Sequence, residues 1–196
     1  MSSLVGASAA CSTRVTEQLQ RLASIQRSAA RCLQPVGIIG PGDGGARECD
    51  AAFQVATVLA KAGMSIVCGG RAGVMGAASR GAAEAGGIAI GILPEDDARS
   101  ANPHLSVAIP TGMGEMRNAL IARSSMCLVA IGGGMGTISE AALGLKWGKP
   151  VFALYEDIQL PGARFASDVD QLVEWVLECL LELIPPESEP PPMRQG

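Results

Sequence analysis

A glycine-rich segment followed by a hydroxyl and a carboxylate is the part of this sequence best suited to chemistry. Residues 132–140 read GGGMGTISE and follow the apolar run Cys127–Ile131. A strand, a glycine loop and a helix N-terminus together form an anion site, because glycine lets the backbone approach a ligand and the first helical N–H groups lack partners. We therefore expect four residues to bind a phosphate: Gly133, Gly134, Gly136 and Thr137. Glu140 lies one turn into the helix and is the candidate catalytic carboxylate.

Thr137 and Glu140 also match a T-x-x-E capping box. In that motif the threonine hydroxyl accepts a hydrogen bond from the backbone three residues on, and the glutamate reaches back to the threonine amide. This structural role competes with a role in ligand binding, although one carboxylate can serve both.

Two more glycine loops follow apolar runs, at residues 40–45 (GPGDGG) and 69–73 (GGRAG). Because the carboxyl ends of parallel strands meet at one edge of a sheet, we expect all three loops to lie together there. Gly69, Gly70 and Arg71 are accordingly candidate phosphate- or nucleotide-binding residues.

The loop at residues 40–45 matches the GxGxxG fingerprint of dinucleotide-binding folds. That fingerprint also requires an acidic residue about 20 positions further on, to hold the adenosine ribose. Cys68–Gly70 stands there instead, whereas Arg71 could meet the 2′-phosphate of NADP. A tight turn that places the next helix on the sheet explains these glycines as well as ligand binding does. Redox catalysis with a dinucleotide therefore ranks low among the functions considered.

Arg117 stands at the start of a predicted helix, in the segment TGMGEMRNALIARSS. The start of that helix should lie at the same sheet edge as the glycine loops. Arg123 falls on another face of the helix, so Arg117 is the candidate catalytic or ligand-orienting cation.

Strand and helix patterns alternate along the chain, which predicts an α/β, Rossmann-like, doubly wound parallel sheet with helices on both faces. The expected strands are Val36–Ile39, Met64–Cys68, Ile88–Leu93, Leu105–Ile109, Met126–Ile131 and Pro150–Leu154. The expected helices are Glu48–Ala62, Val74–Ala85, Glu115–Ser124, Ile138–Trp147 and Val169–Leu183.

Three regions are expected along the chain: an N-terminal extension (1–34), a Rossmann-like nucleotide- or phosphate-binding domain (35–184) and a Pro-rich tail (185–196). The extension carries a roughly helical apolar stripe, formed by Val15, Leu19, Leu22, Ala29 and Leu33. It is also rich in Arg and Ser and poor in acids, as organellar transit peptides are. An added helix is preferred, and both alternatives stay open.

Composition indicates a cytoplasmic α/β protein that binds neither nucleic acid nor membrane. The formal net charge is −4, which gives no general attraction to polyanions. No apolar run approaches the roughly 18 residues of a membrane span. The six cysteines lack metal-ligand spacing and are expected to be reduced thiols, and the single histidine, His104, is expected to be exposed. No metal site is predicted.

Taken together, these residues resemble the "Lonely Guy" (LOG) family of cytokinin riboside 5′-monophosphate phosphoribohydrolases. The family hallmark PGGxGTxxE is similar to residues 132–140, and its double-glycine loop running into G-[LV]-M-G is similar to residues 69–76. The family's catalytic arginine and glutamate fall on Arg117 and Glu140. The resemblance implies a Rossmann-like fold, hydrolysis of an N-glycosidic bond without metal or organic cofactor, and a homodimer or larger homo-oligomer.

Two positions depart from the LOG pattern. Gly132 takes the place of the motif's usual proline, and Asn118 follows Arg117 where an Arg-Lys pair is usual. These departures are similar to a sister branch that includes the molybdenum-cofactor carrier proteins of green algae, which bind a phosphorylated pterin without turning it over. The resemblance thus implies either a nucleoside-monophosphate hydrolase or a carrier of a phosphorylated cofactor, and in both cases a small phosphorylated ligand.

Overall fold

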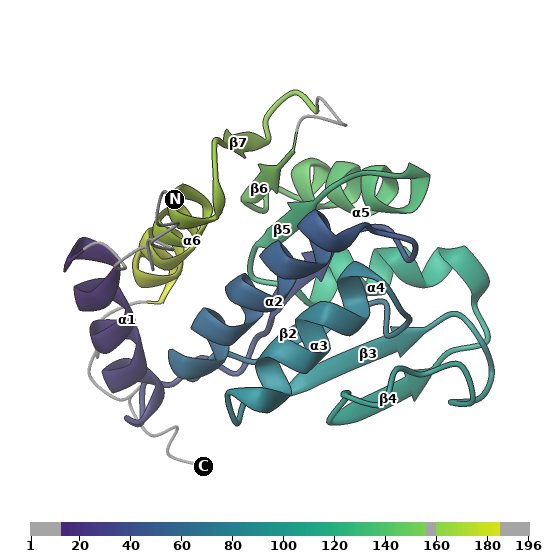
Figure 1. Ribbon diagram of the computed structural model, residues 1–196, viewed down its shortest axis with the longest axis horizontal. Coiled ribbons are helices and arrows are strands. Elements are labelled where there is room, and N and C mark those ends of the chain that lie inside the picture. The colour runs from purple at the N-terminus through teal and green to yellow at the C-terminus, as the bar shows by residue number, and fades with distance from the viewer. Residues whose placement is uncertain (1–12, 156–159, 185–196) are drawn as a thin grey trace, which may run out of the picture.

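The computed structural model describes residues 13–155 and 160–184. The Pro-rich tail and the first twelve residues lie outside the described residues. One sheet of seven parallel strands runs in the order β4-β3-β2-β1-β5-β6-β7 (Figure 1). The strands are β1 (Val36–Ile39), β2 (Ile66–Cys68), β3 (Ala89–Leu93), β4 (Val107–Pro110), β5 (Leu128–Ile131), β6 (Val151–Leu154) and β7 (Arg164–Ala166). The predicted α/β, Rossmann-like fold is confirmed.

Helices cover both faces of the sheet. The α-helices are α1 (Thr13–Gln26), α2 (Ala46–Lys61), α3 (Val74–Glu84), α4 (Asn118–Ser124), α5 (Met135–Lys146) and α6 (Val169–Leu183). Helices α2, α3 and α6 pack with β1 and β2 in one apolar core, and α4 and α5 form a second core on the other face (Figure 1). Strands β1, β2, β5 and β6 are wholly buried because both of their faces are covered.

The order of strands turns around at β1. Strand β1 pairs with β2 on one side and with β5 on the other, with Ile38 opposite Val129 and Ile39 opposite Ala130. The chain segment after β1 leads to β2 on one side of β1, and the segment after β5 leads to β6 on the other side. Because these two segments leave the sheet in opposite directions, a crevice opens beyond the carboxyl ends of β1 and β5. The glycine loops that begin at Gly40 and Gly132 flank this crevice.

Three elements differ from the sequence predictions. Strand β7, which the sequence did not indicate, has one exposed and two half-buried residues, and it exists because it pairs with β6 at the sheet edge. The helix predicted at Glu115–Ser124 is divided into a 3-10 turn, η1 (Gly114–Arg117), and α4. Helix α5 begins at Met135 rather than at Ile138, which places Gly136 and Thr137 inside its first turn.

The N-terminal helix α1 packs against α6, with a smaller contact to α2 (Figure 1). Val15 and Leu22 are buried in this contact, whereas the expected apolar stripe does not extend to Leu33, which is 77% exposed. The helix ends at Gln26, whose side chain accepts a hydrogen bond from the amide of Cys32 at 2.6 Å. That bond and the turn after Gln26 carry Leu33 away from the helix face.

Candidate functional site

The crevice contains a pocket of about 260 Å³. Its walls come from the loops after β1 and β2, from the η1–α4 junction and from the start of α5. The lining residues are Gly40, Pro41, Gly42, Asp43, Arg71, Met75, Glu115, Arg117, Asn118, Gly134, Gly136, Thr137 and Glu140. Six of the nine predicted site residues line this pocket: Arg71, Arg117, Gly134, Gly136, Thr137 and Glu140.

The N-terminus of α5 forms one wall of the pocket. Its N-cap is Gly134, and the amide of Ile138 makes a helical bond to the Gly134 carbonyl at 2.9 Å. The amides of Met135, Gly136 and Thr137 precede that first helical bond, so they are donors without a partner inside the helix. Three adjacent donors at the positive end of a helix dipole can hold an anion.

The predicted capping box is wrong. Thr137 is the third residue of α5 rather than its N-cap, and the N-cap, a glycine, has no side chain to cap with. The carboxylate of Glu140 turns away from the helix end and meets Arg117 instead. Because α5 starts earlier than predicted, neither side chain caps the N-terminus of the helix, and both are free for other roles.

Arg117 and Glu140 form a buried ion pair at the back of the pocket. Nη1 of Arg117 lies 3.2 Å from Oε1 of Glu140, and each side chain is only 7% exposed. The Nε atom of Arg117 is buried and has no hydrogen-bond partner. The two candidate catalytic residues, which are separated by 23 positions in the sequence, therefore meet, and the arginine keeps a donor to spare.

The environment of Glu140 favours its neutral form. Burial raises the pKa of Glu140 to about 7, and Glu115 adds to the rise, while the charge of Arg117 and its hydrogen bond oppose it. Burial prevails because the carboxylate loses most of its hydration and gains a single ionic contact. A carboxyl group that titrates near neutrality can exist in either protonation state under physiological conditions.

Asn118 belongs to the site, although sequence reasoning did not assign it a role. Its Oδ1 accepts from Nη1 of Arg117 at 2.6 Å, and its Nδ2 donates to Oγ of Ser139 at 2.8 Å. Asn118 is buried, and it joins the 3-10 turn to the first turns of α5. The signal that could have found it is its place directly after Arg117, where it departs from the LOG pattern.

The second glycine loop supports the site more than it lines it. A Cβ on Gly69 would lie 2.6 Å from Nη2 of Arg117, so glycine at this position makes room for the guanidinium. Gly70 has a φ of +76° and packs on Leu93, outside the pocket lining. Arg71 lies at the rim, where it forms an ion pair with Glu95. Only Arg71 of this predicted trio faces the pocket.

The first glycine loop packs against the second. The carbonyl of Pro41 accepts from the amide of Val74 at 3.1 Å, and Gly73 lies so close to Gly42 that a Cβ would fall 2.4 Å from its carbonyl oxygen. The glycines of the GxGxxG match thus allow two loops to approach each other. No carboxylate stands at the end of β2 to hold a ribose, and Arg71 is already paired with Glu95.

Gly133 lies between the end of β5 and the N-cap of α5, but it is not among the lining residues. Its neighbour Gly132 has a φ of +67° and donates its amide to the carbonyl of Leu154 at 3.1 Å. The three consecutive glycines therefore divide their roles: Gly132 makes the turn, and Gly134 caps the helix.

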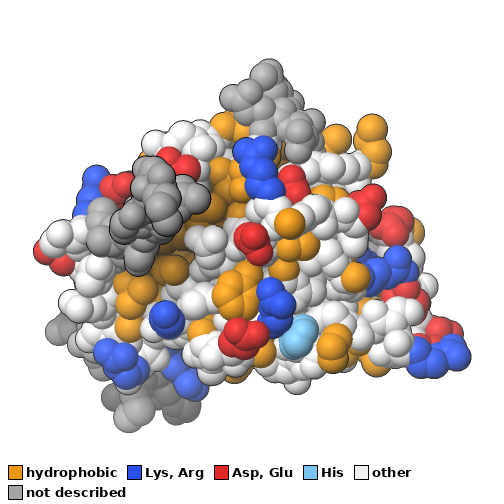
Figure 2. All heavy atoms as spheres, viewed as in Figure 1, with side chains coloured by type: hydrophobic (Ala, Val, Ile, Leu, Met, Phe, Trp, Pro, Cys, Tyr) orange, Lys and Arg blue, Asp and Glu red, His pale blue; other side chains and the backbone are white. Residues whose placement is uncertain are grey.

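His104 is half-buried rather than exposed, and it lines a separate open groove of about 350 Å³ beside α3. Within the described residues, no group of three or more His, Cys, Asp or Glu side chains could hold a metal ion. No described helix is long and apolar enough to span a bilayer. On the face that Figure 2 shows, basic and acidic side chains are interspersed, without a broad basic patch.

The fold and the pocket define a class: a Rossmann-like α/β protein with a glycine-walled pocket at its topological switch point and a buried Arg–Glu pair inside it. The chain belongs to the SLOG cluster4 family, a LOG-like family whose profile matches residues 34–175.

Solved structures of molybdenum-cofactor proteins are similar over nearly their whole length. The molybdenum cofactor binding protein of Rippkaea orientalis is 32% identical, with a TM-score of 0.70, over 75% of this chain and 98% of that one. The molybdenum cofactor carrier protein of Chlamydomonas reinhardtii is 34% identical, with a TM-score of 0.68, over 76% and 99%.

A LOG enzyme is similar over a shorter stretch. The cytokinin riboside 5′-monophosphate phosphoribohydrolase LOG5 of Arabidopsis thaliana is 37% identical over 109 residues, which are 53% of this chain and 47% of LOG5. The resemblance to a LOG-like branch near the molybdenum-cofactor carriers is therefore confirmed.

Proposed function

We propose that this protein binds a small phosphorylated molecule in the pocket between β1 and β5, with the phosphate on the first turn of α5. The support is the set of unpartnered amides at Gly136 and its neighbours, beside the Thr137 side chain, at the positive end of the helix. Arg117 also lines the pocket, with a buried donor that no group of the described residues satisfies.

We infer that the chemistry is hydrolysis of the N-glycosidic bond of a purine-type nucleoside 5′-monophosphate. The observation that carries this inference is the contact between Arg117 and Glu140 inside the pocket. Cleavage of the bond from C1′ to the base nitrogen builds positive charge on the ribose, as in glycoside hydrolysis. Ionised Glu140 stabilises that charge and orients a water molecule.

The bond changes balance without any further reactant. The water oxygen bonds to C1′, the bonding pair of the C1′–N bond leaves with the base, and a water proton ends on the base nitrogen. Arg117 orients the substrate and offsets the negative charge that develops on the departing base. The products are the free base and ribose 5-phosphate.

A second candidate is a protein that carries or stores a phosphorylated cofactor such as the molybdenum cofactor. This candidate is favoured by the extent of the similarity. The match covers 98% and 99% of the two molybdenum-cofactor proteins, but only 47% of LOG5. The same phosphate subsite serves this function, and a Glu140 that stays largely neutral leaves the ligand intact.

One experiment separates the two candidates. The purified protein is incubated with a panel of nucleoside 5′-monophosphates, and free base and ribose 5-phosphate are measured by chromatography. Release of base at catalytic rates supports the hydrolase. Absence of release from every monophosphate, together with molybdenum cofactor retained through purification, supports the carrier.

We further propose that the protein acts in the cytoplasm as a homodimer or larger homo-oligomer. Several exposed apolar side chains lie at the N-cap of η1, on η1, on α4 and on the first turn of α5: Met113, Met116, Leu120 and Met135. Light scattering coupled to size-exclusion chromatography tests the oligomeric state. A monomer at micromolar concentration contradicts it.

A further inference from the structure

One guanidinium nitrogen in the pocket serves two acceptors at once. Nη1 of Arg117 lies 2.6 Å from Oδ1 of Asn118 and 3.2 Å from Oε1 of Glu140. The neutral amide therefore has the shorter bond, and the carboxylate has the longer one. Because Glu140 is buried and, within the described residues, pairs with Arg117 alone, its charge is only partly compensated.

Asn118 is held in this orientation from its other end. Its Nδ2 donates to Oγ of Ser139 at 2.8 Å, and Ser139 donates to the carbonyl of Gly136 at 2.7 Å. Because the amide nitrogen is committed to Ser139, the amide oxygen faces Arg117. A continuous chain of hydrogen bonds thus joins the first turn of α5, where an anion is proposed to bind, to the guanidinium group.

The pocket has more carboxylates than free cations. Asp43, Glu115 and Glu140 line it, while its two arginines are already paired, Arg117 with Glu140 and Arg71 with Glu95. The charged or titratable groups that act on Glu140 are Arg117 and Glu115 of η1, with the neutral thiol of Cys68, whose pKa burial raises, on β2. A dianion on the first turn of α5 would lie one helical turn from an ionised Glu140 and be repelled by it.

We propose that Asn118 is a positioning residue that draws Arg117 partly away from Glu140, so that an anionic ligand enters the pocket together with a proton that Glu140 takes up. Protonation removes the nearest negative charge and releases Arg117 for the ligand. In the proposed hydrolase, Glu140 has to lose this proton again within the complex before it acts as a carboxylate, whereas in a carrier it stays protonated. Asn118 determines how readily this happens, because Nη1 carries two N–H groups and the short bond to Asn118 fixes the direction of one of them, which holds the other at the longer distance from Glu140. This inference rests on the proposed anion site at α5.

Sulfate is the probe for this proposal, because it stays a dianion throughout the neutral pH range and any pH dependence then belongs to the protein. Its affinity is measured by calorimetry from about pH 5.5 to about pH 8.5, and the affinity should fall by about tenfold per pH unit above the midpoint. Repeating the titration in buffers of different ionisation enthalpy counts the protons. Close to one proton should be taken up at the alkaline end, and close to none at the acidic end.

Three variants locate the effect. Glu140→Gln should bind sulfate without pH dependence and without proton uptake. Asn118→Ala should leave Arg117 to Glu140 alone, which favours the ionised carboxyl and moves the midpoint down by about one pH unit. Ser139→Ala should move it in the same direction by less, because the amide of Asn118 loses its anchor.

Asn102→Ala is the matched control. It removes the chain's other asparagine, whose side-chain amide donates to the carbonyls of Gly70 and Arg71 and to Oγ of Ser79 rather than to the Arg117–Glu140 pair. Its midpoint should equal that of the wild type, so an equal shift in both variants would overturn the role of Asn118. Sulfate binding that is independent of pH in the wild type would overturn the proton coupling and leave the anion site standing. If neither sulfate nor a nucleoside monophosphate bound at any pH, the anion site and the inference would both fall.

Discussion

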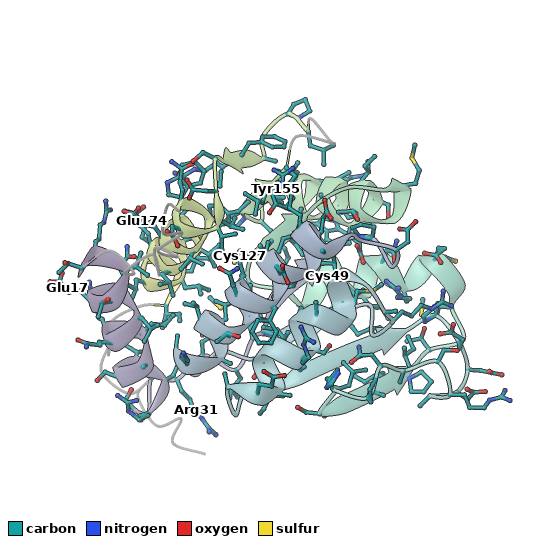
Figure 3. The ribbon with its side chains drawn as sticks, viewed as in Figure 1. Glu17, Arg31, Cys49, Cys127, Tyr155 and Glu174 are labelled. Atoms are coloured by element: carbon teal, nitrogen blue, oxygen red, sulfur yellow. The ribbon has the colours of Figure 1, made fainter. Side chains whose placement is uncertain are left out.

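Two arginine–glutamate clusters of this molecule lie in different surroundings. At the crevice, Arg117 and Glu140 are 3.2 Å apart and almost fully buried. On the outer layer, Arg14 of α1 reaches Glu174 at 2.8 Å and Glu178 at 2.7 Å on α6, and Figure 3 shows Glu174 beside α1. The side chain of Arg14 is 60% exposed, so its shorter contacts are screened by water.

The difference shows that burial, rather than distance, determines the consequence of an ion pair. Desolvation raises the pKa of Glu140 to about 7 even though a guanidinium contacts it. A charge lost from this pair leaves its partner in a medium of low dielectric constant, whereas water replaces a charge lost from the outer cluster. The crevice is therefore where substitutions should change chemistry, and the α1–α6 contact is where they should not.

The largest expected effect is that of Arg117→Ala on base release from a nucleoside monophosphate. The rate should fall by about a thousandfold or more, because a preorganised charge next to the reacting atoms is lost. Arg123→Ala on α4 is the matched control: Arg123 is exposed and stacks on Trp147, so turnover should be retained. Turnover retained in Arg117→Ala would remove Arg117 from the mechanism.

Glu140→Gln should change the pH dependence of stability. An unfolded glutamate has its ordinary pKa and the folded one titrates near 7, so the folded protein binds the extra proton. The stability from this group is complete below the ordinary pKa and is lost as the pH rises through about 7. At pH 8 the variant should be more stable than the wild type by roughly 3 kcal/mol, with little difference near pH 4. Denaturant unfolding at both values measures this, and parallel curves would contradict it.

Gly69→Ala should disturb the crevice without removing a functional group. Its Cβ would fall 2.6 Å from Nη2 of Arg117 and 2.7 Å from Sδ of Met75. We expect a loss of about 1–3 kcal/mol in unfolding free energy and weaker ligand binding, because the guanidinium must move. Gly76→Ala in α3 is the control, since its Cβ would meet only ordinary contacts and helix propensity favours alanine.

Thr137→Val tests the hydroxyl alone. Because Thr137 is buried and is not an N-cap, this near-isosteric change should cost little stability. Affinity for a nucleoside monophosphate should fall by about tenfold, the equivalent of one hydrogen bond to a charged group. Unchanged affinity by calorimetry would mean that the backbone amides hold the phosphate without this side chain.

Arg14→Ala should have the smallest effect. Exposed pairs typically contribute about 0–1 kcal/mol, so the unfolding free energy should fall by no more than that, and less in high salt. Ligand affinity and its pH dependence should equal those of the wild type. A change in either would mean that α1 is coupled to the crevice, and the contrast between the two clusters would fail.

The sequence allowed the main parts of the site to be predicted, because local rules govern them. Three glycine loops after apolar strands have to meet at one edge of a parallel sheet. Arg117 and Glu140 each lie shortly after the carboxyl end of a strand, β4 and β5 respectively, so they lie near the same edge. The start of α5 was mispredicted, because Thr137 and Glu140 satisfy a capping motif that an earlier glycine N-cap made unnecessary. Strand β7 was missed because three residues carry no periodic signal.

The sequence by itself determined the alternation of buried strands and amphipathic helices, and with it the parallel sheet and its glycine-lined edge. The tertiary structure alone decided that one nitrogen of Arg117 donates to both Asn118 and Glu140, and that Gly69 makes room for the guanidinium. It also decided that Arg71 forms an ion pair with Glu95. The physical reason is the range of the interactions. Hydrophobic periodicity and backbone freedom act between neighbours in the chain, whereas desolvation and hydrogen-bond competition depend on groups that only folding brings together.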